Sequence, residues 1–249
     1  ERFLKLRCGK RLGLKGMNPS RPYYLQFTMQ VGKEEFFQIL QEEVEKDFIA
    51  NLDFLAAVGA NHINVSEQSY SIQGQVDTPI LTGGHKHVMD DAEWDRFCDG
   101  LNKLGKIAAD RGFKLCFHHH MGTVVQTSEE TDRMMANTDP RYVFLCYDTG
   151  HFTFAGEDPL AVLKKYVSRV GHVHLKDMRA DVVARVAPEK MSFLQAVRAG
   201  AFTVPGDGCV DFENGAPTRS MEDIAMLDES AMNEFLDSGA VADERLKAM

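Results

Sequence analysis

Apolar residues recur along the chain with two alternating periods, which predict strands separated by helices. Short, nearly continuous apolar runs predict five strands, at 23–30, 61–66, 114–118, 142–147 and 170–175. Stretches with helical spacing follow them and predict helices at 34–58, about 90–112, 127–138, from 158 onward, and 192–199. This β-α order, repeated five times, indicates an α/β fold with a parallel sheet buried on both faces.

Capping residues support the predicted helix boundaries. Asp90 with Glu93, and Thr127 with Glu130, have the spacing of a capping box, in which each side chain bonds the backbone of the other residue. Gly59 is placed to end the first helix, since glycine accepts the left-handed conformation that follows many helices. Two of the predicted helices therefore have specific start signals and one has a specific end.

The two ends of the chain do not follow the alternating pattern. Residues 1–22 are basic and have no clear period, and residues 213–249 are acidic and helix-prone without a visible strand. We expect one domain over residues 1–249, with 213–249 as a divergent acidic helical tail.

Charge and composition narrow the classes of partner. The chain has 249 residues, 44% of them apolar, and a formal net charge of −9. That charge argues against nucleic acid and anionic membranes, which attract positive surfaces, and it suits a neutral polyol or keto-sugar. No apolar run approaches the ~18 residues of a membrane helix. We expect neither a nucleic-acid nor a membrane partner.

The cysteines favour a reducing compartment. The chain has five cysteines, which are widely separated in the sequence and form no CxxC motif. Two of them, Cys116 and Cys146, lie within apolar strands, where cysteine usually acts as a small buried hydrophobe. We expect free thiols and a cytoplasmic location.

Three consecutive predicted strands end in groups that bind metals or move protons. FHHH follows KLC, DTGH follows LCY, and HVHLKD follows VG. Ligand sites in parallel α/β sheets and barrels lie at the carboxyl ends of the strands. One strand-end histidine is more often structural than functional, but three such strand ends in succession indicate a site for a divalent metal.

Side-chain alternation assigns faces on the first two of these strands. His118 and His120 share one face of their strand, and His119 takes the other. Asp148 ends an apolar strand, where a carboxylate is costly unless it is paired or binds a metal.

Alternation also groups His172, His174 and Lys176 on one face of the last predicted strand. Two acidic residues keep alternative interpretations. Asp177 caps the next turn or has a functional role, and Glu67 contributes to the pocket or bonds the backbone at its strand end.

Five motifs carry a family resemblance from about residue 42 to residue 212. In order they are VSEQSYSIQGQ, FHHHMGTVVQTSEE, YDTGHFTFAGEDPL, HVHLKDMR and FTVPGDGCVDF. Together they resemble the inosose dehydratases, which are (β/α)8 TIM barrels of the xylose-isomerase-like type. The resemblance implies a hydro-lyase of inositol catabolism that converts 2-keto-myo-inositol (scyllo-inosose) to a trihydroxycyclohexane-dione. It also implies a divalent metal, manganese or cobalt.

The resemblance also implies metal ligands by matching strands. Asp148 resembles the aspartate ligand of such barrels, and His174 resembles the histidine ligand. The position on the fifth strand falls on His118, where relatives carry glutamate, and His120 is the rival for it.

The remaining site residues are assigned to catalysis and substrate binding. His151 and His120 are the candidates for base and acid, with the order open, and Lys176 is expected to bond the substrate or its enolate oxygen. The residues expected to bind substrate are Glu67, Gln73 and His172.

The family pattern predicts a barrel that is incomplete at both ends of this chain. A full barrel would begin with about two further β/α units before Tyr23 and would end on an eighth strand with a last glutamate ligand. Open sheet edges favour pairing, so a homo-oligomer is possible. The alternatives are a sugar isomerase or epimerase with the same metal logic, and an inactive truncated remnant.

Overall fold

Five parallel strands form the central sheet of the computed structural model, which describes residues 26–29 and 34–212. The strands lie in chain order from β1 to β5. Their bounds are β1 Gln26–Met29, β2 His62–Glu67, β3 Lys114–His118, β4 Val143–Asp148 and β5 Val170–His174. All five predicted strands are therefore confirmed, and β2 and β4 each lie one residue later than predicted.

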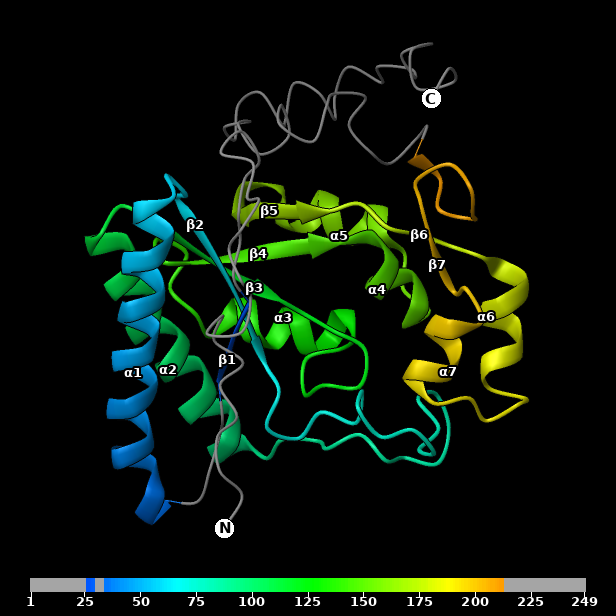
Figure 1. Ribbon diagram of the computed structural model, residues 1–249, viewed down its shortest axis with the longest axis horizontal. Helices are drawn as coiled ribbons and strands as arrows, with labels where there is room; N and C mark the ends of the chain where they lie inside the picture. Colours follow the sequence, from blue (N-terminus) through cyan, green and yellow to red (C-terminus); the bar gives the residue numbers. More distant parts are fainter. Residues whose placement is uncertain (1–25, 30–33, 213–249) are drawn as a thin grey trace.

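Helices cover this sheet in the order that the sequence predicts, with two additions. The helices are α1 Glu34–Ala57, α2 Asp91–Asp110, α3 Ser128–Ala136, α4 Thr149–Phe154, α5 Pro159–Tyr166, α6 Ala180–Val186, α7 Phe193–Arg198 and the 3-10 turn η1 Val167–Arg169. Helices α1 and α2 lie side by side along one flank (Figure 1). Both predicted capping boxes are present, and Gly59 has φ +77° after α1. The sequence did not predict α4 and α6.

The two faces of the sheet differ in chemistry. The helix-facing side is apolar and packs against α1, α2 and α5; its strand residues are Ile63, Val65, Leu115, Phe117, Val143, Leu145, Tyr147 and Val173. The opposite face carries buried or half-buried polar groups and thiols; those used below are His62, Cys116, His118, Cys146, Asp148, His172 and His174.

The sheet is curved around that polar face. The rings of His62 on β2 and His172 on β5 have centroids 6.1 Å apart. In a flat sheet these strands would stand about 14 Å apart, since each strand spacing is ~4.8 Å. The described strands therefore form an arc of a barrel, with polar residues on its inner side.

A β-bulge between β4 and β5 sets the register at the carboxyl end of this arc. Leu145 pairs with Val170 but Cys146 pairs with His172, so Gly171 is the extra residue. The bulge places Asp148 directly opposite His174. Bulges commonly re-aim side chains next to functional sites.

Gly171→Ala is expected to destabilise the protein by about 1–3 kcal/mol, the usual cost of overpacking a core. A Cβ at residue 171 would lie 2.7 Å from Cys116 Sγ and 2.8 Å from Phe144 Cβ, so β5 would have to shift. Urea unfolding followed by circular dichroism measures the change. Gly74→Ala is the control, because a Cβ there meets nothing within 4 Å. Equal stability of the two variants would contradict the tight packing of β5.

A small second layer stands at the end of the sheet toward which β4 and β5 point (Figure 1). It contains α6, α7 and an antiparallel pair, β6 Asp177–Met178 with β7 Phe202–Thr203. Its apolar core also includes the end of α4 and part of the loop between β2 and α2. Strands of two residues carry no periodic signal, so the sequence did not predict this pair.

Asp177 anchors the loop that follows β7. Its buried carboxylate accepts hydrogen bonds from the backbone N–H groups of Met178, Gly206, Gly208 and Val210, at 2.8 to 2.9 Å. The sequence left Asp177 either as a cap of the next turn or as a functional residue. These hydrogen bonds to backbone support the first interpretation. The loop at 204–210 is thereby held beside the carboxyl ends of the strands.

The cysteines and the helices can be compared with the sequence expectations over the described residues. The four described cysteines, Cys98, Cys116, Cys146 and Cys209, are free, as predicted. Within residues 26–29 and 34–212, none of the helices has both the length and the apolar character to cross a membrane. The basic segment 1–22 and the acidic tail 213–249 lie outside the described residues.

Candidate metal centre

Asp148 lies at the centre of the groups that the sequence singled out. Its carboxylate is 0% exposed at the end of β4. Its Oδ2 accepts hydrogen bonds from His118 Nε2 at 3.1 Å and His174 Nδ1 at 3.2 Å, and it also pairs with the Lys176 ammonium. Its Oδ1 accepts from the backbone N–H of His151 at 3.0 Å. The three strand ends thus converge, as the sequence predicted.

The surroundings keep this carboxylate ionised and the neighbouring imidazole neutral. Burial opposes the charge of Asp148, but His151, the hydrogen bonds from His118 and His174, and Lys176 hold the pKa of Asp148 well below its usual range. Burial lowers the pKa of His118 to about 4. A carboxylate beside a neutral imidazole offers lone pairs to a divalent cation.

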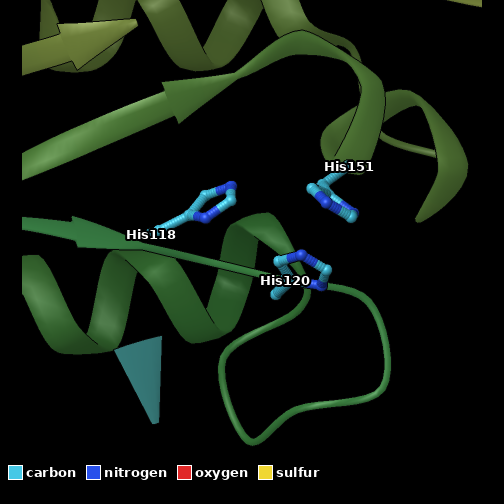
Figure 2. Close-up of side chains that lie close together, drawn as sticks. All are labelled: His118, His120 and His151. Carbon is cyan, nitrogen blue, oxygen red and sulfur yellow. The ribbon is translucent and has the colours of Figure 1, made fainter. Parts of the chain in front are cut away.

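Three histidines form a second group that shares His118 with the first. Figure 2 shows His118 on β3, His120 just beyond it and His151 on α4 turned toward a common space. The ring centroids of His120 and His151 are 3.6 Å apart, and those of His118 and His120 are 5.0 Å apart. Burial lowers the pKa of both His120 and His151 well below the usual value. One nitrogen from each of the three rings lies within 4.8 Å of the others.

Gln73 reaches this histidine group from the long loop between β2 and α2. Its Nε2 donates a 2.6 Å hydrogen bond to the carbonyl oxygen of Met121, and the same nitrogen contacts His120 Nδ1. An amide nitrogen only donates, so a hydrogen bond from Gln73 to His120 Nδ1 would leave the ring proton of His120 on Nε2. The structure therefore brings Gln73 to the predicted site, and its role in binding substrate stays a prediction.

His172 and Glu67, the other predicted substrate-binding residues, lie at different depths. His172 lies two residues before His174 on β5, with ring centroids 5.2 Å apart, and burial lowers the pKa of His172 to about 4. Glu67 is buried at the end of β2, where Oε1 accepts from the Ser69 backbone N–H at 2.6 Å and burial raises the pKa of Glu67. Its described hydrogen bonds are thus to the backbone and side chain of Ser69, and its contact with a substrate stays a prediction.

Cys146 is the residue near the centre that the sequence interpretation missed. We expected a small buried hydrophobe, but its Sγ and one nitrogen each of His118 and His174 lie within 4.8 Å of one another. The signal was the alternation that places Cys146 on the same face of β4 as Asp148. On the opposite face of β3, His119 stacks on Phe152 at 3.6 Å, which confirms the predicted alternation.

The donor atoms fit a borderline divalent metal. Imidazole nitrogens and a buried carboxylate converge from three adjacent strand ends, and a thiol lies beside them. Nitrogen, oxygen and sulfur ligands at one centre are typical of zinc, cobalt and related ions.

Known proteins with similar sequence or fold agree with this architecture. The family model described as "Xylose isomerase-like TIM barrel" matches residues 37–215. An inosose dehydratase of Clostridium beijerinckii is 58% identical over 172 residues, which are 69% of this chain and 57% of that protein. The chain thus spans a little over half of that relative's length.

Two solved structures share the fold at low sequence identity. The probable 3-DHS dehydratase AsbF of Bacillus anthracis has a TM-score of 0.55 at 13% identity, over 84% of this chain and 74% of that one. The IolI protein with a bound zinc atom has a TM-score of 0.54 at 15% identity, over 88% of this chain and 74% of that one. With the family model matching most of the described residues, the chain belongs to the xylose isomerase-like TIM barrel family.

Proposed function

We propose that this chain carries the metal centre of an inosose dehydratase, which removes water from 2-keto-myo-inositol in inositol catabolism. The observation that carries the proposal is the convergence of three consecutive strand ends on the Asp148 carboxylate. The 58% identity to an inosose dehydratase supports the substrate and the reaction. Free buried thiols support a cytoplasmic location.

His118, Asp148 and His174 would hold a divalent ion, manganese or cobalt. The IolI protein, which shares the fold, was solved with a bound zinc atom, and this supports a metal-binding barrel. When bound, the ion supplies Lewis-acid polarisation of the substrate ketone, which favours loss of the neighbouring proton. In the family pattern a last glutamate ligand stands on an eighth strand, and residues 26–29 and 34–212 do not include that strand.

His151 is the proposed base. It takes the proton from the carbon next to the ketone, and the C–H electrons form the enolate. Burial keeps the His151 imidazole neutral, and its Nδ1 has no hydrogen-bond partner among the described residues, so an acceptor lone pair is available.

His120 and Lys176 are proposed to donate hydrogen bonds to oxygen atoms of the substrate. Gln73 holds the proton of His120 on Nε2, from which it can donate to a substrate oxygen. The His120 and His151 rings lie side by side, so both can reach one substrate: the protonated His151 returns the abstracted proton to the leaving β-hydroxyl, whose C–O bond breaks to release water, while His120 Nε2–H donates a hydrogen bond to a substrate oxygen. Lys176 Nζ, beside Asp148, would bond the enolate oxygen. The enol product then tautomerises to the dione.

His151→Asn is expected to lower kcat for scyllo-inosose dehydration by about 10²- to 10⁴-fold, the usual contribution of a general base, with metal content unchanged. The absorbance rise from the conjugated enol form of the dione product measures the reaction. His85→Asn is the control, because His85 is exposed and has no proposed role in the site. Exchange of substrate hydrogen with solvent deuterium without water loss would instead favour the epimerase alternative.

A further inference from the structure

We infer that Cys146 is a metal ligand, so that the centre is built from His118, His174 and the Cys146 thiolate together with Asp148. The inference rests on the proposed function for the presence of a metal, and it adds a sulfur ligand that the family resemblance does not imply. Its basis is the group of three side chains whose Sγ and ring nitrogens lie within 4.8 Å of one another. A single tetrahedral ion with ligand bonds of about 2.0 to 2.3 Å holds its donor atoms about 3.3 to 3.8 Å apart, so side-chain movements of no more than about 1.5 Å would close the group on one ion.

The backbone geometry directs Cys146 to this position. Cys146 and Asp148 share the inner face of β4, and the bulge at Gly171 pairs Cys146 with His172 and Asp148 with His174. Cys146 is also paired across β3 with His118. A thiol and a carboxylate from one strand thus flank the two imidazoles, and the thiol is fully buried.

Cys116 shows that a thiol can be buried on the inner face of the sheet without lying near His118 and His174 as Cys146 does. It is also fully buried and on the inner face, but it lies two residues before His118, and its Sγ points toward the carbonyl oxygen of Lys114 at 3.9 Å. No group of candidate ligands in the described residues includes Cys116. It is therefore a matched control for Cys146.

A thiolate ligand changes which metal the centre prefers. Thiolates favour zinc and other borderline or soft ions, whereas sites made of carboxylate and water suit manganese. Affinity for cobalt and zinc also exceeds that for manganese in general. On binding, the thiol loses its proton to solvent and the sulfur lone pair forms the metal bond. Of the two metals proposed above, a centre with a thiolate ligand favours cobalt over manganese. We expect its affinity for zinc to be at least as high as its affinity for cobalt.

Cobalt provides the direct test, since thiolate-to-cobalt charge transfer absorbs in the near ultraviolet and does not depend on catalysis. The metal-free full chain is titrated with one equivalent of Co²⁺ in a reductant that does not bind metal. The wild type and Cys116→Ala are expected to show the charge-transfer band, and Cys146→Ser and Cys146→Ala are expected to lose it. Far-ultraviolet circular dichroism establishes that each variant is folded.

Metal competition provides the second measurement. The ratio of Co²⁺ to Mn²⁺ affinity is expected to fall by at least ~10-fold in Cys146→Ser, because the oxygen of serine is a harder and weaker ligand than sulfur. The Cys116→Ala ratio should match that of the wild type.

The outcomes separate this inference from the proposed function. If the wild type binds one Co²⁺ without the band, or if Cys146→Ser keeps the band, Cys146 is not a ligand and the inference is overturned while the metal centre stands. If the wild type binds no Co²⁺, both the inference and the proposed metal centre fail. If the band is lost in Cys116→Ala and kept in Cys146→Ala, the sulfur ligand is Cys116 on β3, and the inference about Cys146 is overturned.

Discussion

Asp148→Asn is expected to abolish tight metal binding and to lower kcat/KM for dehydration by at least ~10³-fold. The asparagine keeps the size of the side chain but loses the negative charge that His118, His174 and Lys176 share. Lewis-acid stabilisation by a bound ion is worth several kcal/mol, and each 1.36 kcal/mol is a factor of ten in rate. Elemental analysis of the dialysed protein measures the metal, and the absorbance of the enol form of the dione measures the rate.

A surface carboxylate supplies the control for this substitution. Asp132 pairs with Lys165 on the exterior, where such a pair contributes little. Asp132→Asn should keep both the metal and the rate. If Asp148→Asn bound one equivalent of metal with unchanged affinity, Asp148 would be excluded as a ligand and the three-histidine group would become the better candidate for the centre.

The parts of this centre that the sequence predicted are those that local rules determine. Alternation places His118, Asp148 and His174 on the same side of three strands, and parallel topology brings the carboxyl ends of those strands together. No long-range information was needed, because each strand is a short apolar run that ends in polar residues. The capping boxes of α2 and α3 were predictable for the same reason.

The parts that the sequence did not predict depend on contacts between distant segments. The bulge at Gly171 is visible only when β4 and β5 are paired, yet it sets which residue faces His174. Gln73 is 47 residues from His120, and no local pattern reports their contact. Cys146 has the composition of a core residue, and its place beside two histidines follows from the pairing of β4 with β3 and with the bulged strand β5.

Acid is expected to destabilise the metal-free protein partly through His119, a residue outside the proposed ligand set. Its ring is 0% exposed and stacks on Phe152, and burial, with His118 beside it, lowers the pKa of His119 to about 3. Below pH 6.5 the unfolded chain binds a proton that the folded chain refuses, so stability falls as the pH decreases from 6.5 toward 3. For this histidine alone the loss between pH 7 and pH 5 is about 2 kcal/mol.

His119→Phe is expected to remove that share of the pH dependence, because phenylalanine fills the same apolar site and binds no proton. Urea unfolding at pH 7 and pH 5, with a chelator present, should show the free energy of unfolding falling by about 2 kcal/mol less in the variant than in the wild type. The comparison uses the difference in free energy of unfolding between pH 7 and pH 5 within each protein. Any destabilisation caused by the larger phenylalanine ring is the same at both pH values and cancels. His85→Gln is the control, since His85 is exposed in the folded chain. An equal loss in His119→Phe and wild type would mean that His119 is protonated in the folded state, and its burial against Phe152 would then not keep the ring neutral.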